Sequence, residues 1–254
     1  LYWPNFNSPE NISWAAADGS GGGVLVDDAD LGLLDLPIGL SLDGGSDRLF
    51  VIGYTGHVVG TAGLDGTVGT WPPTNNDAWG GPLVDEHSGR LYFTSGSNGV
   101  TYGKLDGTGS LSTVFLGEAT GMNGGLAFDR DQNRLYGTFL PGGAVQWIRW
   151  INPDTSTGGQ LEPTGKVVSG ASSLAIDHDT GEIYYMNAMP EAPDGNNTIN
   201  RVALAGGAGT QVGSGVVGDE HRKPEPAGAG HHLTAAKAGA AGDQGDRQGA
   251  PRQE

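Results

Sequence analysis

Short apolar segments separated by turn residues run through the first 215 residues of the chain. Within the segments apolar residues stand at every second position, as at Ile12, Trp14 and Ala16 or at Val100 and Tyr102. Alternation with a period of two is typical of half-buried β-strands, and no helical period of 3.6 residues accompanies it. The pattern therefore predicts an all-β domain over residues 1–215.

The apolar segments recur as a repeat. A Leu or Ile followed by an aromatic residue opens each copy, and the copies begin at Leu1, Leu49, Leu91, Leu135 and Ile183. Successive starts are 48, 42, 44 and 48 residues apart. Repeats of this length with strand composition are typical of β-propeller blades, each a sheet of about four strands. In the second copy we expect strands over residues 39–43, 49–54, 58–64 and near 68–71.

Two kinds of turn punctuate each repeat. Six residues before each of the last four repeat starts stands an aspartate: Asp43, Asp85, Asp129 and Asp177. Four residues after each aspartate the chain has Asp, Gly or Asn, which adopt left-handed backbone angles most readily. We predict tight structural hairpins over residues 43–48, 85–90, 129–134 and 177–182, in which the first Asp accepts backbone N–H bonds. Asp-Gly pairs at Asp18, Asp65 and Asp106 predict type I′ turns between the third and fourth strands.

Composition excludes several classes of protein. The formal net charge is −16, which contradicts a nucleic-acid binder that relies on clustered Lys and Arg. The 47 glycines follow no three-residue period, so a collagen-like chain is excluded. No apolar run approaches the ~18 residues of a membrane span. The absence of cysteine excludes a disulfide framework and a thiolate metal site.

The two ends of the chain differ from the repeats. Between Asp219 and Glu254 there is no Phe, Trp, Tyr, Ile or Val. A segment of that composition cannot build a core, so residues 216–254 are predicted to be a low-complexity tail, either disordered or produced by a reading-frame slip. At the other end, Leu1 opens directly on strand-like sequence, and we expect the N-terminal part of the protein to be missing.

Three segments carry a resemblance to a known family. They are Leu1-Tyr-Trp-Pro-Asn5, Ala16-Ala-Asp-Gly-Ser-Gly-Gly-Gly23 and Pro37-Ile-Gly-Leu-Ser-Leu-Asp43. The chain resembles, over about residues 1–215, the YWTD-repeat propellers of low-density-lipoprotein-receptor type, particularly bacterial relatives with a Tyr-Trp-Ala-Asn core. The resemblance implies a scaffold or protein-binding propeller, usually six-bladed in the receptors, with no shared catalytic site. Only five copies are visible, so we expect an incomplete, truncated six-bladed ring.

Loop lengths indicate which rim of the propeller binds. The connectors between strands 2 and 3 and between strands 4 and 1 emerge on one rim and vary widely in length, and variable loops on a rigid scaffold commonly carry binding residues. Aromatic, apolar and acidic side chains gather in these loops: Phe6, Asp27, Asp28, Asp30, Asp77, Trp79, Met189, Glu191 and Asp194. They predict a surface for a cationic or polar partner or for a hard cation, and the alternative is that acidic loops only keep the protein soluble.

Catalytic and metal motifs are weak. Asp129-Arg-Asp131-Gln-Asn133 resembles the opening of an EF-hand loop but has Arg134 where that loop requires Gly, so we interpret it as a structural turn. His57, His87 and His178 lie in different repeats, so the sequence predicts no zinc site. We predict no catalytic residue, no metal ligand and no cofactor, and we leave Ca²⁺ or Mg²⁺ open although no motif supports either ion.

Two classes of function remain open. The first is a noncatalytic propeller, extracellular or in the cell envelope, that binds a protein or glycan partner at the variable-loop rim. The second is a propeller enzyme of the streptogramin-lyase or gluconolactonase-like type that uses a divalent ion. A His or Glu converging from several loops between strands 2 and 3 would favour the enzyme. The first class is preferred because these loops contribute no histidine apart from His57, which stands at the margin of one of them. Only the loops 4–11 and 187–197 contribute a Glu.

Overall fold

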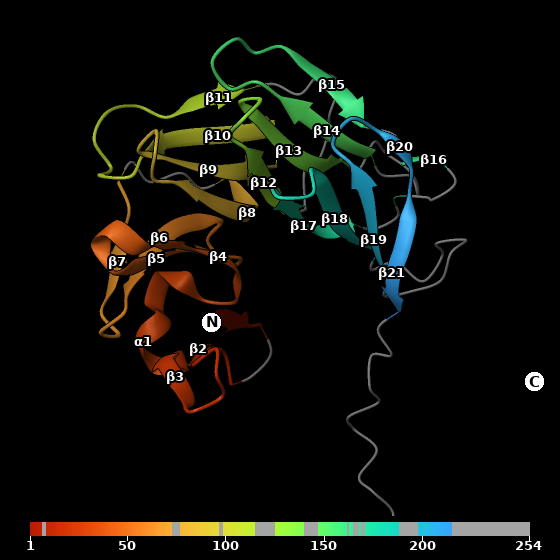
Figure 1. Cartoon of the computed structure of the whole chain (residues 1–254). Coiled ribbons are helices and arrows are strands. Elements are labelled where there is room, and N and C mark those ends of the chain that lie inside the picture. Colours follow the sequence, from red (N-terminus) through yellow and green to blue (C-terminus); the bar gives the residue numbers. More distant parts are fainter. Residues whose placement is uncertain are drawn as a thin grey trace, which may run out of the picture. The chain divides into compact units, whose positions relative to one another are not determined.

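Five antiparallel β-sheets follow one another along the chain (Figure 1). The computed structural model describes residues 1–6, 9–72, 77–96, 99–114, 125–139, 147–161, 163–164, 168, 171–187 and 198–214. The predicted tail, residues 216–254, lies outside the described residues. The all-β prediction is confirmed. Leu49, Leu91, Leu135 and Ile183 each lie in the second strand of a different four-stranded sheet, and Leu1 directly precedes the first strand of the chain.

We number the sheets as blades 1 to 5. Blade 1 has three strands, β1 (Tyr2–Asn5), β2 (Asn11–Ala15) and β3 (Gly22–Val26). Blade 2 comprises β4 (Pro37–Asp43), β5 (Arg48–Gly53), β6 (Val58–Gly63) and β7 (Val68–Thr70). Blade 3 comprises β8 (Ala78–Asp85), β9 (Arg90–Ser95), β10 (Gly99–Lys104) and β11 (Ser112–Val114).

The later blades repeat the four-stranded order. Blade 4 comprises β12 (Leu126–Asp129), β13 (Arg134–Phe139), β14 (Trp147–Ile151) and β15 (Gly158–Leu161). Blade 5 comprises β17 (Ala171–Asp177), β18 (Glu182–Asn187), β19 (Thr198–Ala203) and β21 (Thr210–Ser214). A short parallel pair, β16 (Pro163–Thr164) with β20 (Gly207–Ala208), joins the connector after blade 4 to blade 5.

The first strands of blades 2 to 5 lie innermost. Figure 1 shows β4, β8, β12 and β17 gathered around a common centre, and each contacts the next along the chain. The hydroxyl of Ser41 on β4 accepts a hydrogen bond from the Val84 N–H on β8 at 3.0 Å, which fixes blade 2 against blade 3. This arrangement is that of a β-propeller.

Apolar side chains fill the layers between neighbouring blades. Trp71, only 1% exposed, lies between blades 2 and 3. Its ring centroid is 6.1 Å from those of Phe50 and Phe93, both edge-on, and its Nε1 donates to the Lys104 carbonyl at 3.1 Å. Edge-to-face aromatic pairs of this kind add to the stabilisation from burial. The repeat aromatics therefore pack the blades together.

The hairpins between the first two strands of blades 2 to 5 span the predicted residues, from Asp43 opposite Arg48 to Asp177 opposite Glu182. The fifth residue of each hairpin has a positive φ, between 49° and 66°: Asp47, Gly89, Asn133 and Gly181. The first Asp accepts a backbone N–H two residues on in three of them, at 3.0 to 3.2 Å. Asp43 differs, because its carboxylate accepts from Arg48 Nε at 3.0 Å while residues Gly44–Ser46 form the 3₁₀ turn η2.

The Asp-Gly turns differ from the predicted type I′ geometry. Only the glycine has a positive φ, as at Gly66 with φ of 87°, whereas type I′ requires it at both central residues. The Gly66 N–H donates to the Gly63 carbonyl at 2.9 Å, and Asp65 Oδ1 accepts from the Thr67 N–H at 3.0 Å. Because that bond holds Asp65 in an ordinary conformation, the turn resembles type I followed by a left-handed glycine.

The connector between blades 1 and 2 is also more ordered than the sequence predicted. It contains the single-turn helix α1 (Asp28–Leu31) and the 3₁₀ helix η1 (Gly32–Leu34). Leu31 and Leu34 are each 1% exposed and pack into the layer between the two blades. Elements of one turn are too short to show a helical period, so the pattern did not reveal them.

Candidate functional site

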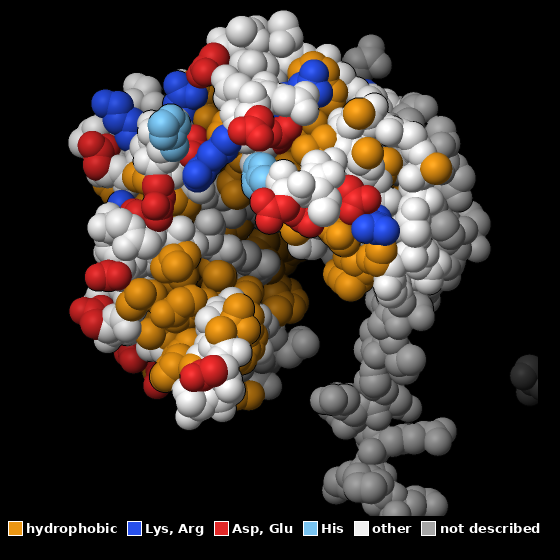
Figure 2. All heavy atoms as spheres, viewed as in Figure 1, with side chains coloured by type: hydrophobic (Ala, Val, Ile, Leu, Met, Phe, Trp, Pro, Cys, Tyr) orange, Lys and Arg blue, Asp and Glu red, His pale blue; other side chains and the backbone are white. Residues whose placement is uncertain are grey.

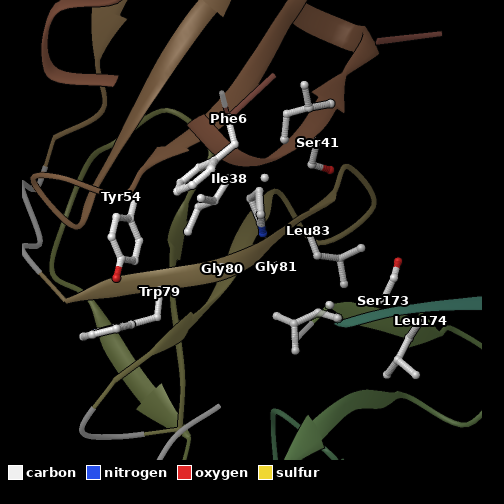
Figure 3. A pocket seen from close by; sticks show the side chains of 15 residues that line it. Phe6, Ile38, Ser41, Tyr54, Trp79, Gly80, Gly81, Leu83, Ser173 and Leu174 are labelled. Atoms are coloured by element: carbon white, nitrogen blue, oxygen red, sulfur yellow. The ribbon is translucent and has the colours of Figure 1, made fainter. Parts of the chain in front are cut away.

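A cavity of about 770 Å³ lies where the innermost strands meet (Figure 3). Its wall comes from β4, β8, β17, the start of β12 and two aromatic residues outside these strands: Phe6, Ile38, Gly39, Leu40, Ser41, Tyr54, Trp79, Gly80, Gly81, Pro82, Leu83, Gly125, Leu126, Ser173 and Leu174. A pocket of this size falls within the range typical of ligand sites in proteins.

Glycine and irregular register shape the wall. Gly81 has φ of 62°, and register shifts interrupt the pairing of β8 with β9 at Gly80 and Gly81. A Cβ at Gly39 would lie 2.9 Å from Pro82 Cδ, and one at Gly125 would lie 3.0 Å from the Leu174 nitrogen. The blades therefore approach so closely here that only glycine fits, and the bulges redirect the strand ends at the mouth of the cavity.

Four rings form what we call the aromatic group: Phe6, Tyr54 and Trp79 line the cavity, and His57 packs against Tyr54 and Trp79. Tyr54 is the hub, with ring centroids 5.9 Å from Phe6, 5.5 Å from His57 and 6.3 Å from Trp79, all edge-on. His57 stacks on Trp79 at 4.3 Å. Figure 3 shows that Phe6, Tyr54 and Trp79 come from three different segments of the chain.

Backbone contacts fix the aromatic group. The His57 N–H donates to the Tyr54 carbonyl at 3.3 Å, and the His57 carbonyl accepts from the Ala78 N–H at 2.9 Å, so blade 2 is tied to the first strand of blade 3. Trp79 Nε1 donates to Asp77 Oδ1 at 3.2 Å. The indole covers Gly96 so closely that a Cβ there would overlap it. These contacts fix Tyr54, His57 and Trp79 relative to one another.

Acidic side chains stand on the connector beside blades 1 and 2. Glu10 accepts from the Leu36 N–H at 2.9 Å, which lowers its pKa, but the neighbouring Asp35 carboxyl, desolvation and the charge of Asp28 together leave the pKa raised. Asp27 caps α1 by accepting from the Asp30 N–H at 3.3 Å. Asp27, Asp28 and Asp30 are exposed. This group carries a concentrated negative charge.

The binding residues predicted from the sequence fall in several places. The structure brings Phe6, Asp77 and Trp79 together and places Asp27, Asp28 and Asp30 on and before α1. Met189, Glu191 and Asp194 lie outside the described residues. Tyr54 and His57 were missed as members of the aromatic group, although their place between β5 and β6 puts them in a connector of the same rim.

A second group of polar side chains lies on the hairpin rim. Ligand atoms of Asp129, Asp131 and His178 lie within 4.8 Å of one another. The first two residues belong to the hairpin of blade 4, and His178 belongs to that of blade 5. The sequence could not pair them, because they stand almost one repeat apart.

Comparisons with known proteins support the fold. No family model matches the chain, and no curated protein matches its sequence. A chain from the crystal structure of a nidogen/laminin complex is 15% identical with a TM-score of 0.63, and the match covers 81% of this chain and 74% of that one. TolB from Acinetobacter baumannii is 14% identical with a TM-score of 0.65, and the match covers 84% of this chain and 52% of the TolB chain. A putative TolB from Agrobacterium tumefaciens is 12% identical with a TM-score of 0.59, over 81% of this chain and 70% of that one.

At these identities the likeness shows a β-propeller fold and does not show a family. The finer resemblance to YWTD-repeat propellers stays a prediction. Among the described residues, no helix is long and apolar enough to cross a membrane.

Proposed function

We propose that the chain is a noncatalytic β-propeller module that binds a partner, a protein or a glycan, at the mouth of the central cavity. The observation that carries the proposal is the aromatic group. Phe6 and Tyr54 are 43% and 42% exposed although both are large and apolar. Aromatic side chains held in a fixed geometry are the usual anchors of protein interfaces, because they bury much area at little cost in conformational entropy.

The acidic connector supports the choice of partner. Asp35 and Asp28 raise the pKa of Glu10, and Asp27 and Asp30 add negative charge to the same region. Carboxylates around an apolar anchor favour a partner of opposite charge and mainly raise the association rate. We therefore expect a protein segment with basic residues to bind more tightly than a neutral glycan.

The comparisons are in keeping with this proposal. One similar fold was solved in a complex of two proteins, nidogen and laminin. An extracellular or cell-envelope location is proposed from the resemblance to receptor propellers.

A six-bladed ring, of which this chain supplies five blades, is also proposed. Trp3 and Val24 are exposed on the face of blade 1 that points away from blade 2, and Met186 and Ile199 are exposed on the face of blade 5 that points away from blade 4. A further blade between these faces would cover all four side chains.

The test is capture of partners from the secreted and envelope fractions of the source organism, followed by binding kinetics with the captured partner. Trp79→Ala removes the stacked ring, and we expect mainly faster dissociation. Its matched control is Trp14→Ala, since Trp14 is 37% exposed and belongs to no ring contact of the aromatic group.

A triple variant, Asp27→Asn with Asp28→Asn and Asp30→Asn, tests the charge. We expect slower association and a weaker dependence of binding on salt, because exposed charges are screened over about 8–10 Å at physiological ionic strength. The control changes the same number of charges on the opposite rim, at Asp18, Asp65 and Asp106. Equal capture by the wild type, Trp79→Ala and the triple variant would contradict the proposal, whereas loss of capture after glycosidase treatment would identify a glycan.

One observation favours the alternative, a lyase or lactonase that uses a divalent ion. His57 stacks on Trp79, which lines the cavity, and the buried Nδ1 of His57 has no hydrogen-bond partner among the described residues. The group of potential metal ligands that the described residues contain is on the opposite rim, however. Turnover of a lactone or cyclic peptide with added Mg²⁺ or Ca²⁺, abolished by His57→Gln, would replace the binding proposal by the enzyme.

A further inference from the structure

Two neighbouring hairpins place three potential metal ligands together on the hairpin rim. Asp129 and Asp131 come from the turn between β12 and β13, and His178 comes from the turn between β17 and β18. Figure 2 shows acidic, basic and histidine side chains on the face of the molecule that is turned toward the viewer. Asp131 and His178 are exposed, and Asp129 is buried.

Asp129 is a buried carboxylate that lacks full compensation. It is 2% exposed. Its Oδ1 accepts from the backbone N–H groups of Asp131 and Gln132 at 3.0 and 3.3 Å. Its Oδ2 is buried and has no hydrogen-bond partner among the described residues. A buried charge without a partner is costly, so this oxygen points to a ligand.

The equivalent aspartates of blades 2 and 3 are compensated by the protein itself. Asp43 Oδ2 accepts from Arg48 Nε at 3.0 Å. Asp85 Oδ2 accepts from the Ser88 hydroxyl at 2.5 Å, and its other oxygen lies 3.4 Å from Arg130 Nη2.

In blade 4 the corresponding arginine is used elsewhere. Arg134 has the position of Arg48, five residues after the aspartate, but its guanidinium lies 4.0 Å from the centroid of the Trp150 ring. No ion pair joins it to Asp129 among the described side chains. Asp129 instead has His178 of the next blade and Asp131 as its nearest potential metal-ligand partners.

We propose that Asp129, Asp131 and His178 bind a divalent transition-metal ion of the Zn²⁺ type between blades 4 and 5. Two carboxylates and an imidazole suit this class, whereas Ca²⁺ and Mg²⁺ prefer oxygen ligands only. Zinc takes such ligands at about 2.0–2.2 Å and leaves a fourth position for water. The side chains of Asp131 and His178 are exposed and can rotate, which brings the three ligand atoms to coordination distance from an ion. The ion neutralises Asp129 and joins two blades that are separate in sequence.

Calorimetric titration with ZnCl₂ tests the site. The tail carries His221, His231 and His232, whose imidazoles can bind zinc by themselves, so the parent protein has all three replaced by Gln. We expect this parent to bind one equivalent of zinc. Asp131→Asn and His178→Gln should each weaken binding at least about tenfold, because a protein ligand is lost.

The matched control is His87→Gln, since His87 is an exposed histidine in the equivalent hairpin of blade 3 and should not affect zinc binding. Zinc should also raise the melting temperature of the parent, because a ligand that binds only the folded state stabilises it, and this shift should vanish in His178→Gln. Both substituted side chains are exposed, so circular dichroism should show folded variants.

Three results would overturn the proposal: no binding by the parent at about 100 µM zinc, equal binding by the parent and by both ligand variants, or binding of Ca²⁺ as tight as that of zinc. None of these results bears on the cavity mouth, which lies on the other rim.

Discussion

Replacing Trp71 by Phe should destabilise the protein strongly, because Trp71 fills the layer between blades 2 and 3. The indole is 1% exposed, and its Nε1 donates to the Lys104 carbonyl. Loss of that hydrogen bond costs about 1 kcal/mol, although the Lys104 carbonyl keeps the hydrogen bond that it accepts from the Gly107 N–H at 2.9 Å. The smaller ring leaves about 40 Å³ empty, which at about 24 cal/mol per Å³ adds roughly 1 kcal/mol.

The lost transfer free energy of the missing ring atoms adds about 1 kcal/mol more, so the free energy of unfolding should fall by about 3 kcal/mol. Relaxation of the surroundings is limited, because a Cβ at Gly103 would lie 2.8 Å from Trp71 Cη2 and the ring edge is therefore already in contact with backbone.

Urea unfolding followed by far-ultraviolet circular dichroism measures the change without relying on tryptophan fluorescence. Trp14→Phe is the control, since Trp14 is 37% exposed, and it should cost less than about 1 kcal/mol. A Trp71→Phe variant that loses no more than the control would refute the assignment of this residue to the packing between blades.

Three further outcomes are expected. Gly181→Ala should lower the free energy of unfolding by about 1 kcal/mol, because φ is 66° at this position, although the added Cβ would meet nothing within 4 Å. An unchanged free energy of unfolding would show that the hairpin adapts. Hydrogen bonds from the Thr67 hydroxyl and then from the Thr67 N–H lower the pKa of Asp65 in the folded protein. The ionised Asp65 therefore stabilises the folded state above the unfolded-state pKa of about 4, and this stabilisation is lost as the pH falls through the lower folded-state pKa. Urea midpoints measured from pH 5 to 2.5 should therefore fall more in wild type than in Asp65→Asn, and parallel curves would contradict this. Met186 and Ile199 are exposed on the outer face of blade 5, so we expect the protein to self-associate through this face. Met186→Thr with Ile199→Thr should reduce that self-association in sedimentation velocity, and a variant that associates equally would exclude the face.

The local features of the fold could be read from the sequence because they depend on neighbouring residues. Alternation placed the strands of blade 2 within a residue or two, since side chains of a strand point to opposite faces in turn. The left-handed residues of the hairpins, such as Asp47 and Asn133, were predicted because few residue types adopt that conformation readily. The Asp-Gly turns were misjudged, since a side-chain bond such as that of Asp65 to Thr67 competes with the intrinsic preference of the pair.

The sites depended on the tertiary structure because their members come from different blades. Sequence indicated that Phe6 and Trp79 share a rim, but only the stacking of blades shows that Tyr54 and His57 join them in one group. In the same way, Asp129 and His178 were read as separate turn residues, and the contact between two hairpins makes them neighbours. The sequence repeat determines the structure of each blade. The apolar layers between blades determine which rim residues come into contact. That packing joins residues some 40 to 50 positions apart, so no local sequence pattern reveals it.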